Sequence, residues 1–164
     1  MKIGLLSDTH NNVTNTQAAL DIFRAQGIIT LLHCGDITRP QLVSLFAGWD
    51  VTFVLGNVDE DVAGLSAAAR AIGAPPPRPM YTLTLNGTTI ALVHGQDDEA
   101  LQALIESQQY RWVFHGHTHR RRDERVRRTR VVNPGALGGR HIGPCSAAIV
   151  DLSAEAVTFI EIAG

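Results

Sequence analysis

The sequence has little cysteine, little net charge and no long apolar run. Its two cysteines, Cys34 and Cys145, lie far apart in 164 residues, which excludes a disulfide framework and favours buried apolar roles for both. The formal net charge is −2, so charge alone does not indicate a nucleic-acid partner. No segment is apolar for long enough to cross a bilayer and no signal peptide is recognisable, so we expect a cytoplasmic protein with no membrane partner.

The chain does have the apolar content and the histidines of a folded, chemically active domain. Hydrophobic residues make up 45% of the sequence, enough to bury a core, and the length predicts a single domain spanning residues 1–164. Seven histidines are many for this length and are the first indication of metal or acid–base chemistry.

The order of apolar segments predicts an α/β protein. Residues 2–55 alternate strand and helix, which is the pattern of a parallel sheet. A proline-rich stretch, residues 74–79, is interpreted as a stiff connector in preference to a polyproline ligand, and a hairpin follows it around Asn86-Gly87. We expect the second half to be mostly antiparallel. The predicted strands are 2–7, 28–32, 51–55, 81–85, 88–93, 112–114, 147–152 and 156–162.

Several predicted strands end at side chains that bind metal ions. Asp8 and His10 follow the first strand, and because residues two apart in an extended chain face the same way, these two side chains are expected to converge. His117 and His119 repeat the spacing. The ends of α/β strands are the natural place for such groups to meet. The complete donor set is Asp8, His10, Asp36, Asn57, His94, His117 and His119.

The chemistry of this donor set predicts two ions. Oxygen and imidazole donors suit first-row divalent metals, and seven donors are too many for one closed tetrahedral site. Two ions that share a carboxylate are the simplest solution. Glycines stand beside four donors, where tight turns and close backbone approach are needed. They are Gly35, Gly56, Gly95 and Gly116.

The motif order Asp-x-His, Gly-Asp, Gly-Asn, His-Gly and Gly-His-x-His, within residues 8–139, resembles the calcineurin-like metallophosphoesterases. The short length and the segments 33–36, 56–59 and 133–135 are similar to the small YfcE-like phosphodiesterase branch. The resemblance implies a four-layer α/β/β/α sandwich with two mixed sheets. It also implies a metal-dependent phosphoesterase, in particular a phosphodiesterase, acting on a small or nucleotide-like phosphate ester.

The same resemblance implies a role for each donor. It places Asp8, His10 and His119 on one ion, Asn57, His94 and His117 on the other, and Asp36 between them. Manganese is the expected metal, with iron, nickel, cobalt or zinc as alternatives, and a bridging hydroxide attacks phosphorus in line. The implied catalytic residues are Asp36, Asn57 and His94, and the implied substrate contacts are Asn57, His94 and Arg140.

The sequence departs from the larger family members at one position. Many of them carry a histidine directly after Gly-Asn, where it helps to protonate the leaving group, and here that residue is Val58. Asp59 follows and is interpreted as orienting a loop or an imidazole. We therefore predict a steep preference for good leaving groups, such as aryl phosphodiesters.

The remaining histidines and the arginines each allow two interpretations. His33 and His115 either orient donors or are structural, and His141 beside Arg140 is a candidate for the substrate mouth. The arginines between residues 120 and 130 indicate either a phosphate or RNA stripe or, as we favour, the outer face of a hairpin.

The implied fold also leaves the function open. A retromer subunit shares this fold and is a protein-interaction scaffold, so a non-catalytic scaffold is the alternative function, with a nuclease as a third. Homo-oligomer formation is left open.

Overall fold

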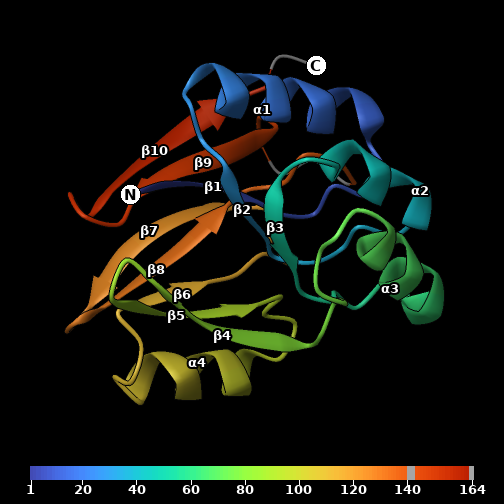
Figure 1. Ribbon diagram of the computed structural model, residues 1–164. Helices are drawn as coiled ribbons and strands as arrows, with labels where there is room; N and C mark the ends of the chain where they lie inside the picture. Colours follow the sequence, from blue (N-terminus) through green and yellow to red (C-terminus); the bar gives the residue numbers. More distant parts are fainter. Residues whose placement is uncertain (140–142, 163–164) are drawn as a thin grey trace.

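Two five-stranded mixed sheets pack face to face, with helices on both outer sides (Figure 1). The computed structural model describes residues 1–139 and 143–162. The first sheet has the order β10-β9-β1-β2-β3 and the second β4-β5-β6-β8-β7. The strands are β1 (Lys2–Leu6), β2 (Thr30–His33), β3 (Asp50–Phe53), β4 (Met80–Leu85), β5 (Thr88–Val93), β6 (Trp112–Phe114), β7 (Arg121–Val126), β8 (Thr129–Pro134), β9 (Ser146–Asp151) and β10 (Ala156–Glu161).

The helices begin where side chains cap their free amides. Asn12 accepts from the Asn15 backbone N–H at the start of α1, and Asp97 accepts from that of Ala100 at the start of α4. Pro40 is the first residue of α2, a position where its missing N–H costs no hydrogen bond. None of the helices in the described ranges combines the length and apolarity needed to span a membrane. The helices are α1 (Val13–Ala25), α2 (Pro40–Val43), the 3₁₀ turn η1 (Ser44–Phe46), α3 (Val62–Ala71) and α4 (Asp98–Glu106).

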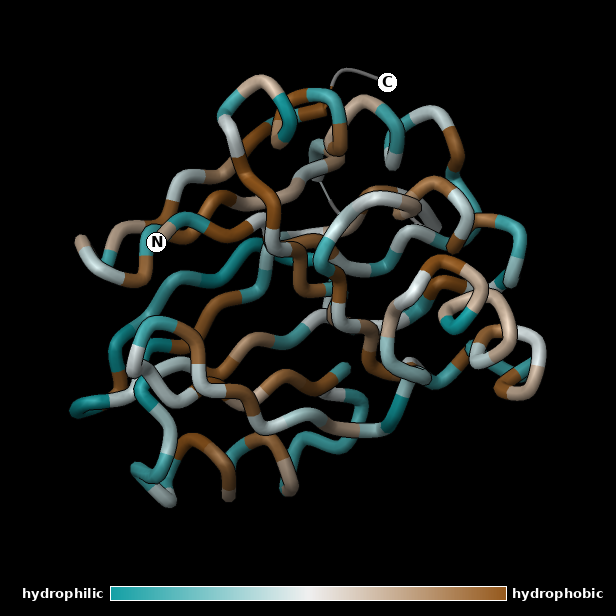
Figure 2. The backbone as a smooth tube through the Cα atoms, viewed as in Figure 1, coloured by the Kyte–Doolittle hydropathy of each residue, from teal (hydrophilic) through white to brown (hydrophobic). Residues whose placement is uncertain are grey.

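Three apolar layers hold the four layers of secondary structure together. Leu5, Trp112 and Phe114 lie in the layer between the sheets, with Cys34, so the prediction that this cysteine packs in the core is confirmed. A second layer joins the first sheet to α1, α2 and α3, and a third joins the second sheet to α4. The expected α/β/β/α sandwich is therefore confirmed. In Figure 2 the brown colour of hydrophobic residues runs along many strands, whereas β7 is largely teal, the colour of hydrophilic residues.

The expectation of a mostly antiparallel second half holds for four of the six strand pairs formed there, but the second sheet also contains two parallel pairs. Strands β5, β6 and β8 are all parallel to one another, and only β4 and β7 run against their neighbours. The physical reason is that α4 provides a crossover between β5 and β6, while the β7–β8 hairpin places its first strand at the sheet edge. Parallel strands carry their carboxyl ends to one edge, and this brings the loops after β5 and β6 together.

Candidate metal centre

The loop after β1 buries the side chain of Asp8. Its backbone N–H donates to the Gly35 carbonyl, which ties the loop to the one after β2. The Asp8 side chain is fully buried, and its Oδ2 accepts from the Ser7 hydroxyl at 2.5 Å and from the His117 backbone N–H at 3.1 Å. Its other oxygen, Oδ1, has no hydrogen-bond donor among the described residues. A buried carboxylate oxygen without a donor is costly and indicates a place for a cation.

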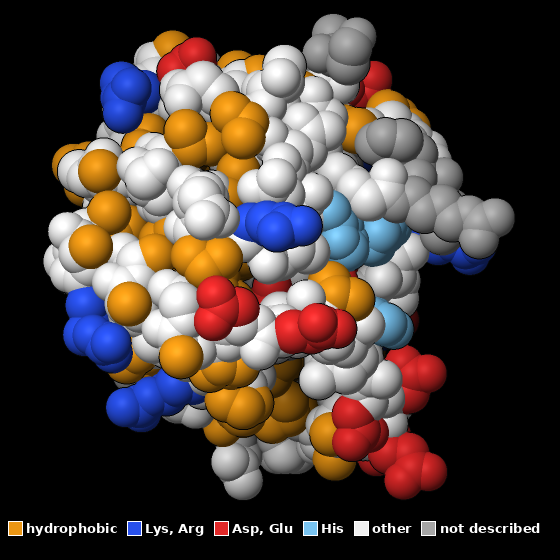
Figure 3. All heavy atoms as spheres, turned by 90° about the vertical axis from the view of Figure 1, so that its right-hand side faces the viewer, with side chains coloured by type: hydrophobic (Ala, Val, Ile, Leu, Met, Phe, Trp, Pro, Cys, Tyr) orange, Lys and Arg blue, Asp and Glu red, His pale blue; other side chains and the backbone are white. Residues whose placement is uncertain are grey.

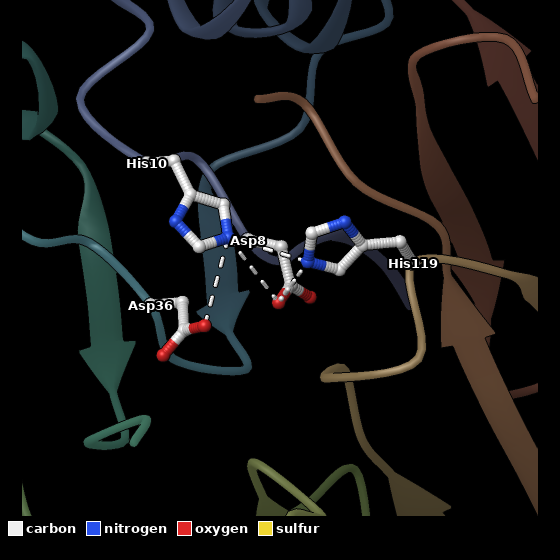
Figure 4. A group of neighbouring side chains, drawn as sticks. All are labelled: Asp8, His10, Asp36 and His119. Carbon is white, nitrogen blue, oxygen red and sulfur yellow. Dashed lines mark hydrogen bonds and ion pairs between the residues drawn. The ribbon is translucent and has the colours of Figure 1, made fainter. Parts of the chain in front are cut away.

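Three further side chains surround this oxygen (Figure 4). His119 Nε2 lies 3.2 Å from Asp8 Oδ1, and the Nε2 atoms of His10 and His119 are 3.2 Å apart. Asp36 turns Oδ2 toward His10 Nε2 at 3.6 Å. Figure 4 shows the four side chains pointing toward one another, with Asp8 and His10 on the loop after β1 and Asp36 and His119 on two other loops. Asp8, His10, Asp36 and His119 together form a group that could hold a metal ion.

Asp36 also reaches a second group of donors with its other oxygen. Asp36 Oδ1 lies 3.3 Å from His94 Nε2, which is itself 3.1 Å from Asn57 Oδ1. His117 Nδ1 lies 3.0 Å from the same Asn57 oxygen. The carboxylate of Asp36 thus stands between the two groups, one oxygen toward each. Contacts between neighbouring side chains therefore link all seven donors predicted from the sequence into one cluster.

The spacing and chemistry of both groups fit divalent ions. Ligand atoms at about 2.0 to 2.1 Å from one tetrahedral ion lie about 3.3 Å from each other. Most separations between neighbouring donors in the pocket, 3.0 to 3.6 Å, fall near that value. His94 donates from Nδ1 to the Cys34 carbonyl at 2.7 Å, so Nε2 is the ring nitrogen that faces Asp36 and Asn57. A carbonyl that fixes an imidazole in this way is the usual support for a metal-binding histidine.

Asp8 and His10 approach each other, as predicted. The predicted cause, the alternation of side chains along an extended strand, is wrong. Strand β1 ends at Leu6, and neither residue is extended: φ is 51° at Asp8 and 42° at His10. Asp36, His117 and His119 also have positive φ, between 57° and 65°. Residues other than glycine seldom adopt this conformation, and clusters of them are typical of functional sites. Left-handed turns therefore aim these side chains.

The second pair of donors two residues apart, His117 and His119, does not converge on one point. His117 turns toward Asn57, whereas His119 turns toward Asp8, so the two rings enter different groups. Gly116, just before them, lies against the first strand's loop: a Cβ there would stand 1.9 Å from Ser7 Oγ and 2.6 Å from Asp8 Oδ2. At Gly56 a Cβ would stand 2.0 Å from Asp36 Oδ1. Both glycines are needed for the close approach that the sequence predicted.

Asp59 fastens the loops that carry Asp36 and Asn57. It is buried, and its two oxygens accept three backbone N–H groups, those of Asp36, Gly56 and Thr38, at 2.7 to 2.9 Å. Burial raises the pKa of this carboxyl, and the three backbone hydrogen bonds oppose the rise. The interpretation of Asp59 as a loop-orienting residue agrees with these contacts.

Asp59→Asn is expected to loosen the loop that carries Asp36. In the variant an NH₂ group replaces one of the two carboxylate oxygens, so an N–H of the side chain faces a backbone N–H with no acceptor between them. Such a lost hydrogen bond costs about 1 to 3 kcal/mol of stability. Displaced donors are expected to lower metal affinity by about 10- to 100-fold. Urea unfolding and calorimetric metal titration measure the two effects. Glu60→Gln removes the same charge from an exposed neighbour and is the control; equal losses in both variants would contradict the role of Asp59.

Two buried histidines support the site from outside it. His33 accepts from the Gly35 backbone N–H through Nδ1 and contacts the Thr9 hydroxyl through Nε2 at 3.1 Å. Burial lowers the pKa of His33 to about 3. Burial also lowers the pKa of His115 to about 4, aided by the nearby charge of Arg122. Both rings are therefore neutral in the fold and lie outside the two donor groups.

This burial predicts a loss of stability in acid. In the unfolded chain each ring takes up a proton near pH 6.5, whereas in the fold it does so only near pH 3 or 4. The free energy of unfolding therefore falls as pH drops from about 6.5 to 4, by about 1.4 kcal/mol per pH unit for each histidine. Urea unfolding in chelator between pH 7 and 4.5 measures this slope. In His33→Gln the free energy of unfolding is expected to depend less steeply on pH, by the contribution of one histidine. An unchanged slope would contradict the lowered pKa of His33.

The structure treats the remaining predicted site residues differently. Asn133 is buried and donates to the Gly116 carbonyl and the Thr118 hydroxyl, so it shapes the loop before the metal-type histidines. Arg140 and His141 lie outside the described residues. Sequence reasoning missed Ser7 as a partner of Asp8, although a hydroxyl next to a metal-type carboxylate was a usable signal.

The arginine hairpin is held by ion pairs within the chain. Arg122 pairs with Glu124, Arg125 with Glu155 and Arg130 with Asp123. Arg121 pairs with the more exposed Glu161. These contacts support the hairpin interpretation over an RNA-binding stripe, because paired guanidinium groups are less available to phosphates.

The two facing mixed sheets and the donors gathered at their strand ends define a class, that of the metallophosphoesterase sandwiches. Figure 3 shows histidine side chains together on the face of the molecule where these strands end. The family model described as the calcineurin-like phosphoesterase superfamily domain matches residues 1–155. The chain belongs to this family, and it is therefore a phosphoric ester hydrolase.

Individual relatives agree with this assignment. The chain is 29% identical over 154 residues to the phosphodiesterase MJ0936 of Methanocaldococcus jannaschii, covering 92% of this chain and 93% of that protein. A solved archaeal phosphodiesterase superposes with a TM-score of 0.91 at 28% identity, covering 99% and 100% of the two chains. Escherichia coli YfcE, at 19% identity and a TM-score of 0.71 over 99% and 100%, shares the fold. The likeness to YfcE concerns the fold, and the two phosphodiesterase relatives agree with the family assignment.

A further solved structure shares the fold. Vps29 from Entamoeba histolytica, solved with zinc, superposes with a TM-score of 0.71 at 19% identity, covering 97% of this chain and 90% of that one. At this identity the likeness concerns the fold alone.

Proposed function

We propose that the chain is a dinuclear metal-dependent phosphodiesterase. The observation that carries the proposal is the position of Asp36, whose two oxygens lie toward two separate groups of donors. The family implies divalent metals, and phosphodiesterase relatives at 28 and 29% identity support a diester substrate. Manganese is the proposed metal, because a mixture of carboxylate, amide and imidazole donors suits first-row ions.

The proposed ligands divide between two ions. Asp8, His10 and His119 hold one ion, Asn57, His94 and His117 hold the other, and Asp36 belongs to both. When bound, such a pair supplies a hydroxide nucleophile at neutral pH and clamps the attacking and leaving oxygens of an in-line displacement at phosphorus.

The chain's own residues prepare the pocket for this reaction. The carboxylates of Asp8 and Asp36 offset only two of the four positive charges that two divalent ions bring, so the pocket favours an anionic phosphodiester. Cys34 holds the His94 ring through its carbonyl oxygen, and Ser7 holds Asp8, so neither donor has to reorient. Asn57 and His94 are also the proposed substrate contacts, together with Arg140.

Metal removal tests the proposal. Chelation is expected to abolish hydrolysis of bis(p-nitrophenyl) phosphate, and added Mn²⁺ to restore it, because the proposed nucleophile is a hydroxide that forms at neutral pH only with the ions bound. Elemental analysis of the reloaded protein is expected to give about two ions per chain. Hydrolysis that survives complete chelation would rule the proposal out, and one ion per chain would rule out the dinuclear form.

A scaffold or a nuclease has less support. A scaffold is free to lose donors, whereas here all seven donor positions hold residues that can bind a metal. A nuclease needs free cationic side chains along its nucleic acid, and most arginines of the hairpin are ion-paired.

A further inference from the structure

An apolar cavity lies on the outer face of the second sheet, between the paired strands β4 and β5 and helix α4. It has a volume of about 520 Å³, which is within the range of about 300 to 1,000 Å³ typical of small-molecule sites. Met80 of β4 and its register partner Val93 of β5 form its floor, and α4 forms the opposite wall. The side chains that make the wall apolar are Met80, Val93, Ala100, Leu101, Leu104 and Tyr110.

One end of this cavity adjoins the candidate metal centre. His94 lines the cavity, and its Nε2 lies 3.1 Å from Asn57 Oδ1, so its ring stands between the cavity and the second group of donors. The Leu55 backbone N–H donates to the Arg78 carbonyl at 2.8 Å, and Pro79, the next residue, lines the cavity. Figure 3 shows hydrophobic side chains gathered on the same face of the molecule as the histidines. A phosphate ester at Asn57 would therefore lie one side chain away from the cavity.

The wall of the cavity carries almost no charge. No lysine or arginine of the described residues lines it. The carboxylate of Asp97 lies in the wall, but it caps α4 by accepting from the Ala100 backbone N–H at 2.9 Å. An anionic group in the cavity would lose hydration and meet no cation, which is unfavourable. An uncharged ring is stabilised by the apolar surface that it removes from water, and Met80 and Tyr110 are side chains that favour contact with rings.

We propose that this cavity receives one ester group of the substrate, and that the substrate is a phosphodiester in which this group carries an uncharged apolar ring. The proposal rests on the proposed phosphodiesterase function for the phosphate and on the cavity for the ring. The phosphate lies at the metal centre and the ring lies beside α4, on the two sides of His94. A substrate with a second phosphate in place of the ring fits less well, because it brings a further anion to an apolar wall.

Nuclear magnetic resonance of the methionine methyl groups tests the cavity without hydrolysis. The chain has two methionines, Met80 in the cavity wall and Met1 at the N-terminus, so each methyl signal is readily assigned. Phenol added to the chelator-treated full chain at pH 7 is expected to shift the Met80 signal in a saturable way and to leave the Met1 signal unchanged. Benzoate, which has the same ring with a negative charge, is expected to bind at least about tenfold more weakly.

Two matched variants connect the cavity to the substrate. Ala100→Phe places a ring in the cavity from an exposed position of α4. It is expected to weaken phenol binding and to raise KM for bis(p-nitrophenyl) phosphate, each by about tenfold, with kcat nearly unchanged. Ala67→Phe makes the same change at an exposed position of α3, which does not line the cavity, and is expected to behave as the unmodified chain does.

The possible failures are distinguishable. A Met80 signal that does not respond to phenol, equal binding of phenol and benzoate, or equal effects of the two variants would each overturn the proposal. An unchanged KM in Ala100→Phe, with phenol binding weakened, would overturn the part that places an ester group of the substrate in the cavity. Absence of hydrolysis would count against the phosphodiesterase alone, because the Met80 signal would still decide whether the cavity binds an uncharged ring.

Discussion

Asp36→Asn is expected to lower kcat/KM for bis(p-nitrophenyl) phosphate by about 10³-fold or more, because the loss of a shared ligand removes several kcal/mol of transition-state stabilisation. The substitution keeps the shape of the side chain and an oxygen that can accept from the Val58 backbone N–H, as Asp36 does at 3.2 Å. It removes the charge that lies between the two groups of donors. Steady-state kinetics in Mn²⁺ measures the effect.

The charge state of this residue strengthens the expectation. Burial raises the pKa of Asp36, but the hydrogen bond and charge of His94 outweigh burial and bring the pKa below its ordinary value. The carboxylate is thus charged at neutral pH, ready for a cation. Asp21→Asn, on the exposed side of α1, removes the same charge far from the pocket and is expected to keep full activity. Normal turnover by Asp36→Asn with two bound ions would contradict the shared-ligand role.

The second large effect concerns the leaving group. Val58 is 37% exposed beside the pocket and has no proton to donate, at the position where larger family members carry a histidine. Rates are therefore expected to fall steeply as the pKa of the leaving alcohol rises across a series of aryl and alkyl phosphodiesters. General acid help, which is worth about 10²- to 10⁴-fold, is missing at this position.

Val58→His tests the same reasoning by adding an acid. The variant is expected to raise rates for poor leaving groups by about 10²-fold while leaving good ones nearly unchanged, which flattens the dependence. Val58→Gln adds polar bulk without a titratable proton and is the matched control. Equal rates across leaving groups in the unmodified chain, with the chemical step limiting, would contradict the prediction.

Much of the fold followed from local patterns. Apolar runs of strand length and the Asn86-Gly87 turn predicted eight of the strands with small errors at their ends; the second strand, expected at 28–32, occupies Thr30–His33. Strands β7 and β8 were expected only as an arginine hairpin, without strand bounds. The parallel pairing of β6 with β8 could not be read in this way, since it depends on which edge the β7–β8 hairpin takes. Pairing partners are a property of the whole sheet.

The candidate site was also predictable only in part. The seven donor residues were predictable because each follows a strand, often beside a glycine. The aim of their side chains was not, because it comes from left-handed backbone at Asp8, His10 and Asp36 that no spacing rule describes. The carboxylate of Asp59 also shows this limit, since the three amides that it binds belong to loops after different strands.

The sequence by itself determined the types of chemical group available and the strand ends at which they stand, since side-chain chemistry and apolar periodicity are local properties. Only the tertiary structure decided that His117 and His119 serve different groups of donors and that Asp36 lies between these groups. The physical reason is that distances between residues far apart in the chain are set by how the two sheets pack, and binding chemistry depends on those distances.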